Sequence, residues 1–146
     1  MQLTLFSDLA LRVLMFTHGA GDRLVTIDEI AESYAISRTH LTKVVNALTR
    51  SGYLQAVRGR SGGLRLARPA DEILLGDVVR TTEPDFALVE CLSTGNRCAI
   101  TNCCRLRGVL NEALGAFLSV LDRTTLESIA LRPKDFRSLA RIGEDR

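Results

Sequence analysis

Two short amphipathic helical patterns followed directly by a glycine-rich hairpin pattern restrict the fold of this chain more than any other feature. From residue 27 to residue 50 apolar residues recur at helical spacing, with a short break at Ala35-Ile36. After Gly52 two short strand-like runs flank Arg58-Gly59-Arg60-Ser61-Gly62-Gly63. A helix-turn-helix followed by a basic hairpin predicts a winged helix, so the expected fold class is mainly α with a small β-hairpin wing.

Each expected helix begins at a residue that can cap it. Thr4 or Ser7 is suited to cap a first helix in the N-terminal segment. Thr26 and Glu29 have the spacing of a capping box, in which the two side chains satisfy free backbone N–H groups at the start of a second helix. Ser37 is placed to cap a third helix. The side chains expected to face the core from that third helix are Leu41, Val44, Val45 and Leu48.

Positive charge is concentrated in the same third of the chain. The net charge of the whole chain is only +2, yet residues 36–68 carry seven basic side chains and no acid, which leaves the remainder at −5. Such an excess attracts a polyanion, and double-stranded DNA is the expected partner. The third helix, which would be the recognition helix, would enter a major groove, and the wing would reach phosphates or a minor groove. For His40 the alternative is that it is simply a solvated helix residue. The candidate DNA-binding residues are Ser37, Arg38, Thr39, His40, Lys43, Arg58, Arg60 and Gly62.

A long amphipathic helix is expected from Arg105 to about Asp122, with an apolar stripe that a compact winged helix cannot cover. A second copy of the same helix would cover it, which predicts a homodimer that reads a near-palindromic operator. The alternative is that the helix folds back on its own domain. The chain is thus divided into a winged helix-turn-helix domain at 1–82, with its recognition helix at about 37–50 and wing at about 53–67, a cysteine loop at 83–104, a dimerisation helix with a short following helix at 105–131, and a flexible tail at 132–146.

All four cysteines of the chain lie in the segment from Cys91 to Cys104, just before the long helix. The chain shows no secretory signal and no apolar run near the roughly 20 residues that cross a bilayer, so a cytoplasmic location without membrane contact is expected. Thiols stay reduced there, which favours a metal site or a redox sensor over structural disulfides. The chain has no Ser-His-Asp set and no phosphate-binding glycine loop, so an enzyme is not expected.

The spacing of the cysteines is Cys-x6-Cys-x5-Cys when Cys104 is taken as the third member. Zinc sites prefer pairs two to four residues apart, and no histidine follows His40 to complete one. An iron-sulfur cluster, whose larger body suits widely spaced thiolates, fits the pattern better but normally takes four protein ligands. A thiol-based redox switch that uses Cys103 and Cys104 remains an alternative.

Over nearly its full length the chain resembles the iron-sulfur winged-helix repressors, and among them the nitric-oxide-sensing repressors. The matching segments are Met1-Gln2-Leu3-Thr4 with Phe6, Asp8, Leu11 and Arg12; Ser37-Arg38-Thr39-His40; Val57-Arg58-Gly59-Arg60-Ser61-Gly62-Gly63; Gly76-Asp77-Val78-Val79-Arg80; and Cys98-x-Ile100-Thr101-x-x-Cys104-Arg105-Leu106. The similar regulators of cluster biogenesis place a histidine three residues after the third cysteine, where this chain has Arg107. That departure favours the nitric oxide sensors.

The resemblance implies a set of ligands and a signal. Cys91, Cys98 and Cys104 would hold one cluster per subunit, with 4Fe-4S favoured over 2Fe-2S, and Cys103 would be a bystander. Asp8 of the other subunit would be the fourth ligand, whereas residue chemistry alone makes it a first-turn acid paired with Arg12. Nitrosylation of the cluster would release DNA and derepress genes for nitric oxide detoxification and nitrogen-oxide metabolism. The loop of six residues between the first two cysteines varies in length among the similar repressors.

Overall fold

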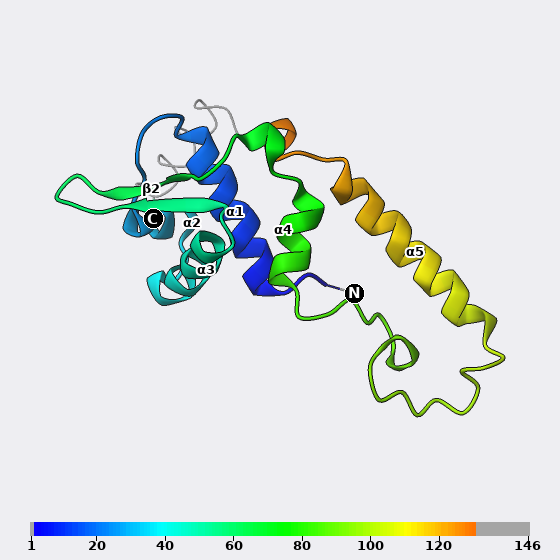
Figure 1. Ribbon diagram of the computed structural model, residues 1–146. Coiled ribbons are helices and arrows are strands. Elements are labelled where there is room, and N and C mark those ends of the chain that lie inside the picture. Colours follow the sequence, from blue (N-terminus) through cyan, green and yellow to red (C-terminus); the bar gives the residue numbers. More distant parts are fainter. Residues whose placement is uncertain (1, 131–146) are drawn as a thin grey trace.

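The computed structural model describes residues 2–130, and the tail expected at 132–146 lies outside the described residues. Figure 1 shows a helical domain from which a two-stranded hairpin projects on one side, while a long helix runs along the other. The fold class is confirmed as mainly α with a small antiparallel hairpin. In chain order the elements are α1 (Leu5–Gly19), α2 (Ile27–Tyr34), α3 (Arg38–Arg50), β1 (Leu54–Val57), β2 (Gly63–Leu66), the 3₁₀ turn η1 (Ala70–Glu72), α4 (Leu75–Thr82), the 3₁₀ turn η2 (Glu90–Leu92), α5 (Arg105–Asp122) and the 3₁₀ turn η3 (Glu127–Ile129).

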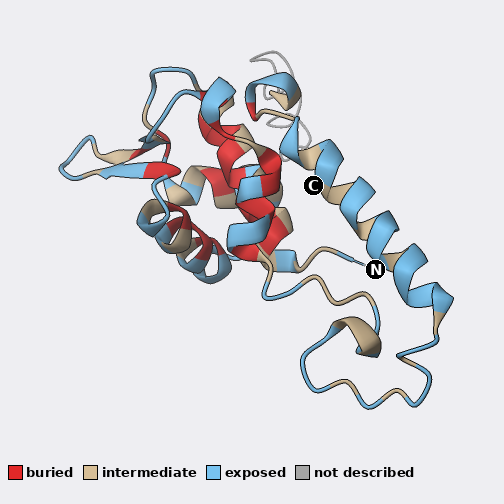
Figure 2. Cartoon of the chain, turned by 45° about the vertical axis from the view of Figure 1, so that its right-hand side comes forward, coloured by how far each residue is buried: buried red, intermediate tan, exposed pale blue. Residues whose placement is uncertain are grey.

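Helix α1 forms the centre of the core. Thr4 is its N-cap, because the Thr4 hydroxyl accepts a hydrogen bond from the Ser7 backbone N–H at 3.2 Å. The helix contacts both α3 and α4, and its side chains at Ala10, Val13 and Leu14 are fully buried. The buried residues of the chain are concentrated in this layer, as Figure 2 shows. Helix α1 therefore packs helix α3 and helix α4 into one core.

The helix-turn-helix is formed by α2 and α3. At the start of α2 the Thr26 hydroxyl accepts the Glu29 backbone N–H at 3.1 Å, while the Glu29 carboxylate is held chiefly by Arg23. The turn is made by Ala35, whose backbone is left-handed with φ +52°. Ser37 does occupy the N-cap position of α3, but the prediction that it caps the helix was wrong in detail, because its side chain makes no capping hydrogen bond. The four expected core residues of α3, Leu41, Val44, Val45 and Leu48, are all buried.

The hairpin pairs Leu54 with Leu66 and Val57 with Gly63 in antiparallel register. Strand β2 is joined to the domain by Leu64, which exchanges two backbone hydrogen bonds with Val25, at 2.7 and 3.1 Å. A Cβ atom at Gly63 would lie 2.8 Å from the Val25 carbonyl oxygen. Glycine at this position therefore allows the wing to approach the loop before α2 closely.

Helix α5 runs from Arg105 to Asp122, as the periodicity predicted, and contains no buried residue. Its C-terminal end is joined to the winged-helix domain, because the Leu126 N–H donates to the Ile73 carbonyl at 2.8 Å and the Leu75 N–H donates to the Thr124 carbonyl at 2.9 Å. Leu126 itself is fully buried. The segment after α5 forms only the 3₁₀ turn η3 within the described residues, where a short helix was expected.

None of the helices described between residues 2 and 130 is long and apolar enough to cross a bilayer.

Candidate nucleic-acid interface and cysteine loop

The exposed face of α3 carries the residues that the sequence indicated for base and phosphate contacts. Ser37, Arg38, Thr39, His40 and Lys43 are all exposed, while the opposite face of the helix is packed in the core. The structure thus brings these five residues together on the first two turns of the recognition helix. Such an arrangement leaves the N-terminal part of the helix free to enter a major groove.

The charged side chains of this face differ in their partners. Arg38 forms an ion pair with Asp28 of α2, with 2.9 Å between Nε and Oδ1, and both side chains are largely exposed. The side chains of His40 and Lys43 have no ion pair or hydrogen-bond partner among residues 2–130. Because an exposed ion pair contributes about 0–1 kcal/mol, Arg38 can leave Asp28 for a phosphate at little cost.

The wing places Arg58 and Arg60 at the exposed tip of the hairpin. Gly59 has φ +124°, a conformation that side chains rarely allow. The Gly62 N–H closes the turn by donating to the Gly59 carbonyl at 3.0 Å, and a Cβ atom at Gly62 would lie 2.9 Å from that oxygen. Gly62 therefore shapes the tip that presents the two arginines.

Two of the seven basic residues of the segment serve the hairpin itself. The Arg65 Nε donates to the Gln55 side-chain oxygen at 3.0 Å on the neighbouring strand. The Arg68 guanidinium lies 4.6 Å from the centre of the Tyr53 ring, and its Nε donates to the Gly52 carbonyl at 3.2 Å. The sequence-wide count of positive charge did not distinguish these structural arginines from those at the wing tip.

The cysteine loop, residues 83–104, joins α4 to α5 and carries four free thiols. Cys91, Cys98 and Cys104 are half-buried, whereas Cys103 is exposed and its S–H donates to the Ile100 carbonyl at 3.4 Å. Cys91 is in η2 and Cys104 is the N-cap residue of α5. The structure therefore distinguishes Cys103 from the other three by exposure.

Asn96 and Thr101 fix the backbone around Cys98, a role that the sequence analysis missed. The Cys98 N–H donates to the Asn96 side-chain oxygen at 2.9 Å, and the Thr101 hydroxyl donates to the Cys98 carbonyl at 2.8 Å. The Asn96 amide nitrogen also donates to the Thr101 hydroxyl oxygen at 2.8 Å, which closes the network. An Asn side chain often accepts a hydrogen bond from the backbone N–H two residues later and so forms a turn. The sequence therefore carried a local signal for this feature.

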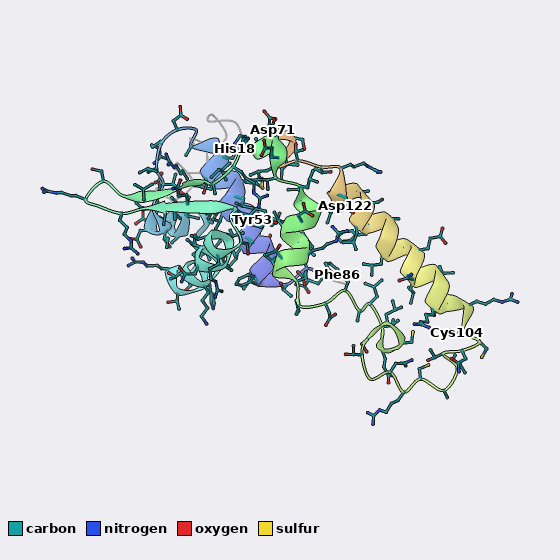
Figure 3. All side chains as sticks on the ribbon, in the orientation of Figure 1. His18, Tyr53, Asp71, Phe86, Cys104 and Asp122 are labelled. Carbon is teal, nitrogen blue, oxygen red and sulfur yellow. The ribbon has the colours of Figure 1, made fainter. Side chains whose placement is uncertain are left out.

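A hollow of about 360 Å³ lies beside Cys104, at the start of α5. Figure 3 shows Cys104 at the N-terminal end of α5, away from the core of the winged-helix domain. The residues that line the hollow are Leu92, Thr101, Cys104, Arg107, Gly108 and Asn111. Within residues 2–130 no three His, Cys, Asp or Glu side chains of one chain converge as they would on a single metal ion.

Asp8 lies in the first turn of α1 and is paired with Arg12. Two contacts join them, at 3.1 Å between Oδ1 and Nε and at 3.0 Å between Oδ2 and Nη2. The Asp8 side chain is 43% exposed and the Arg12 side chain is 46% exposed. The geometry of one chain therefore gives Asp8 the i, i+4 ion pair expected from its position in the helix.

An exposed, basic recognition helix with an adjoining arginine-tipped wing defines a winged-helix DNA-binding protein. The model of the Rrf2 family, described as iron-dependent transcriptional regulators, matches residues 3–132. The chain belongs to the Rrf2 family of transcriptional regulators.

Relatives with known names match over nearly the whole chain. The HTH-type transcriptional regulator NsrR of Bacillus subtilis is 45% identical over 148 residues, which cover 99% of this chain and 100% of the relative. The regulator of the same name from Geobacillus kaustophilus is 47% identical and covers 95% of this chain and 96% of its own. Among solved structures, oxidised CymR of Staphylococcus aureus is similar with a TM-score of 0.72 at 26% identity, over 89% of this chain and 96% of that one. IscR of T. potens has the same fold, with a TM-score of 0.69 at 22% identity over 88% of this chain and 85% of that one.

Proposed function

We propose that this chain is a homodimeric transcriptional repressor that binds a near-palindromic operator and releases it in response to nitric oxide, through one iron-sulfur cluster per subunit. The whole-length similarity to regulators named NsrR supports the proposal. The observation that carries it is the set of three free, half-buried thiols on the loop between the winged helix and α5. The genes controlled would be those that detoxify nitric oxide or metabolise nitrogen oxides.

The donor set fits such a cluster by its chemistry. Thiolates are the usual protein ligands of iron-sulfur clusters, and Cys91, Cys98 and Cys104 are free and partly shielded from solvent. We favour a 4Fe-4S over a 2Fe-2S cluster. When bound, the cluster would supply iron that reacts with nitric oxide. The residues of one chain leave the ligand set one short, which calls for a ligand from elsewhere.

That ligand is Asp8 of the partner subunit. To serve in this way Asp8 must exchange its contact with Arg12, and the solvent-exposed pair is worth only about 0.3–0.5 kcal/mol for an i, i+4 pair on a helix. The carboxylate would then connect α1 of one subunit to the cysteine loop of the other. Since α1 packs against the recognition helix α3, loss of that connection would shift the position of α3.

The uncovered face of α5 supports the homodimer. Leu106 and Val109 are 60% exposed and Val120 is 49% exposed, although all three are large apolar residues. Full burial of such a side chain contributes about 1.5–3 kcal/mol, and these three have roughly half of that still to gain, so a second α5 packed along the first has a driving force. A two-fold dimer would also present the two α3 helices about 34 Å apart, the distance between successive major grooves.

The experiment that tests this function combines cysteine substitution with anaerobic DNA binding. Each of Cys91→Ala, Cys98→Ala and Cys104→Ala should lose iron, sulfide and cluster-dependent operator binding. The matched control is Cys103→Ala, which should keep all three. Equal loss in all four variants would show that the assignment of ligands is wrong.

A thiol-based redox regulator is the second candidate, and one observation favours it. Cys103 is the most exposed of the four thiols and adjoins Cys104 in sequence. Exposed thiols are the ones that oxidants reach first. In this case Cys103→Ala would abolish the response to an oxidant, and the purified protein would contain no iron.

A further inference from the structure

Glu83 is the first residue of the cysteine loop, and its carboxylate holds the beginning of α1. Its Oε1 atom accepts the Thr4 backbone N–H at 2.8 Å and the Thr4 hydroxyl at 3.1 Å. The two residues are 79 positions apart in the chain. One oxygen atom thus connects the loop that carries the thiols to the helix that begins at Leu5.

The position of Glu83 is itself well determined. Its N–H donates to the Val79 carbonyl at 2.8 Å, which ends α4, and its backbone is extended at φ −82° and ψ 137°. Pro84 follows, and a residue before proline is confined to this extended region. The side chain therefore starts from a backbone that is held on both sides.

A buried hydroxyl network continues the connection into the domain. The Ser7 hydroxyl, which is fully buried, donates to the Thr82 hydroxyl at 2.8 Å, and the Ser7 backbone N–H donates to the Thr4 hydroxyl oxygen at 3.2 Å. Thr82 in turn donates to the Val78 carbonyl at 2.9 Å. The start of α1 and the end of α4 are therefore joined by a continuous set of hydrogen bonds in which Glu83 is the outermost member.

Glu83 is also where the loop is tied to the rest of the winged helix. Among the described residues, every hydrogen bond between the loop at 83–104 and the segment at 2–82 involves Glu83. Immediately beyond it a hollow of about 470 Å³ is lined by the segment that precedes α1, by the start of the loop and by α5, with Phe86 and Phe117 in its lining. Figure 3 shows Phe86 just after the end of α4. Among the described residues, a rearrangement of the loop can therefore reach α1 through hydrogen bonds only by way of Glu83.

We infer that Glu83 is the positioning residue that transmits the state of the cysteine loop to α1, and through α1 to the recognition helix of the same chain. This inference rests on the proposed function and deepens it. The route lies within one subunit and is separate from the contact between subunits that Asp8 would make. It requires only that an acceptor oxygen stays at this position, so the negative charge of Glu83 is dispensable.

The variants that test the inference separate the acceptor from the charge. Glu83→Ala removes both bonds to Thr4, whereas Glu83→Gln keeps an oxygen that can accept them. Asp85→Ala is the matched control, because Asp85 is an exposed acid of the same loop whose side chain accepts only the nearby Ala87 N–H within the described residues. In protein without a cluster, hydrogen exchange at the Thr4 amide should be faster in Glu83→Ala and unchanged in the other two variants.

The closing experiment measures operator affinity of each protein, with and without its cluster, at one salt concentration. Coupling between two sites typically changes affinity by roughly 5- to 150-fold, and the wild-type ratio should lie in this range. Glu83→Ala should bind the cluster normally, as judged by absorption, and lower the ratio well below the wild-type value, because only the connection through Asp8 would remain, while Glu83→Gln and Asp85→Ala should keep the wild-type ratio. A Glu83→Ala protein with the wild-type ratio would overturn this inference alone. Wild-type protein whose affinity ignores the cluster would overturn the proposed function, and the inference with it.

Discussion

Arg80 on α4 and Asp122 at the end of α5 form a two-point ion pair directly above Gly76. The Nη2 and Oδ2 atoms are 2.9 Å apart, and the second contact joins Nη1 to Oδ1. Figure 3 shows Asp122 at the C-terminal end of α5, on the side that faces α4. A Cβ atom at Gly76 would overlap the Asp122 carboxylate. Glycine at position 76 therefore allows α5 to be attached to the winged-helix domain in this way.

Gly76→Ala should destabilise the protein by about 1–3 kcal/mol, because the added methyl group forces the carboxylate out of its place. The free energy of unfolding in urea measures the effect. Gly115→Ala is the control, since a Cβ atom there meets nothing within 4 Å in the described chain. That change should stabilise α5 by about 0.5–1 kcal/mol. Equal stabilisation by both changes would show that Asp122 does not need the space above Gly76.

The same ion pair predicts a pH dependence. The hydrogen bond from Arg80 is the main cause that lowers the pKa of the Asp122 carboxyl below its ordinary 3.8, and the pairing raises the pKa of Arg80. A carboxyl whose pKa is lower in the folded state stabilises the protein above its unfolded pKa, and that contribution is lost as the pH falls through the folded pKa. The Tm difference between wild type and Asp122→Asn should therefore be present at neutral pH and disappear in acid below 3.8. A difference that stays constant into that acid range would exclude the ion pair as its cause.

Ser7→Ala should cost about 1–3 kcal/mol, because it removes the hydrogen bond that the fully buried Ser7 hydroxyl donates to the buried Thr82 hydroxyl. Chemical denaturation gives the value. The exposed Ser51 hydroxyl makes no hydrogen bond within residues 2–130, so Ser51→Ala should change stability by less than about 0.5 kcal/mol. Similar values for the two alanine variants would mean that the buried hydroxyl network contributes nothing.

The arginines of the wing should separate into two kinds. Arg58→Ala and Arg60→Ala should each weaken operator binding and lower the slope of log affinity against log salt by about 1, because each removes one phosphate contact. Arg68→Ala should leave that slope unchanged and lower stability by about 0.5–1 kcal/mol, because its guanidinium stacks on Tyr53. A reduced slope for Arg68→Ala with unchanged slopes for the tip arginines would reverse the assignment.

The elements that the sequence predicted well are those set by neighbouring residues. The Thr4 and Thr26 caps, the core face of α3 and the extent of α5 follow from periodicity and from side chains that bond within a few positions. Ser37 shows the limit even of this local reasoning, because a residue of the right type stands at the N-cap without bonding there.

The features that could not be predicted join residues far apart in the chain. Nothing in the sequence pairs Glu83 with Thr4 or Arg80 with Asp122, since an acid and its partner 79 or 42 positions away meet only once the whole domain is packed. Likewise the count of basic residues could not show that Arg68 is turned onto Tyr53. The ligand roles of the cysteines stay predictions, because no three such side chains converge within one chain among residues 2–130, and the role of Asp8 depends on a second chain.

The measurement that tests the account most directly is the anaerobic native mass of the wild-type protein before and after exposure to nitric oxide. The account predicts a dimer that carries one iron-sulfur cluster per subunit, with a mass that changes when nitric oxide is added and with loss of operator binding in the same sample. A dimer or monomer free of iron and sulfide, or a cluster-loaded dimer whose mass and operator binding nitric oxide leaves unchanged, would contradict it.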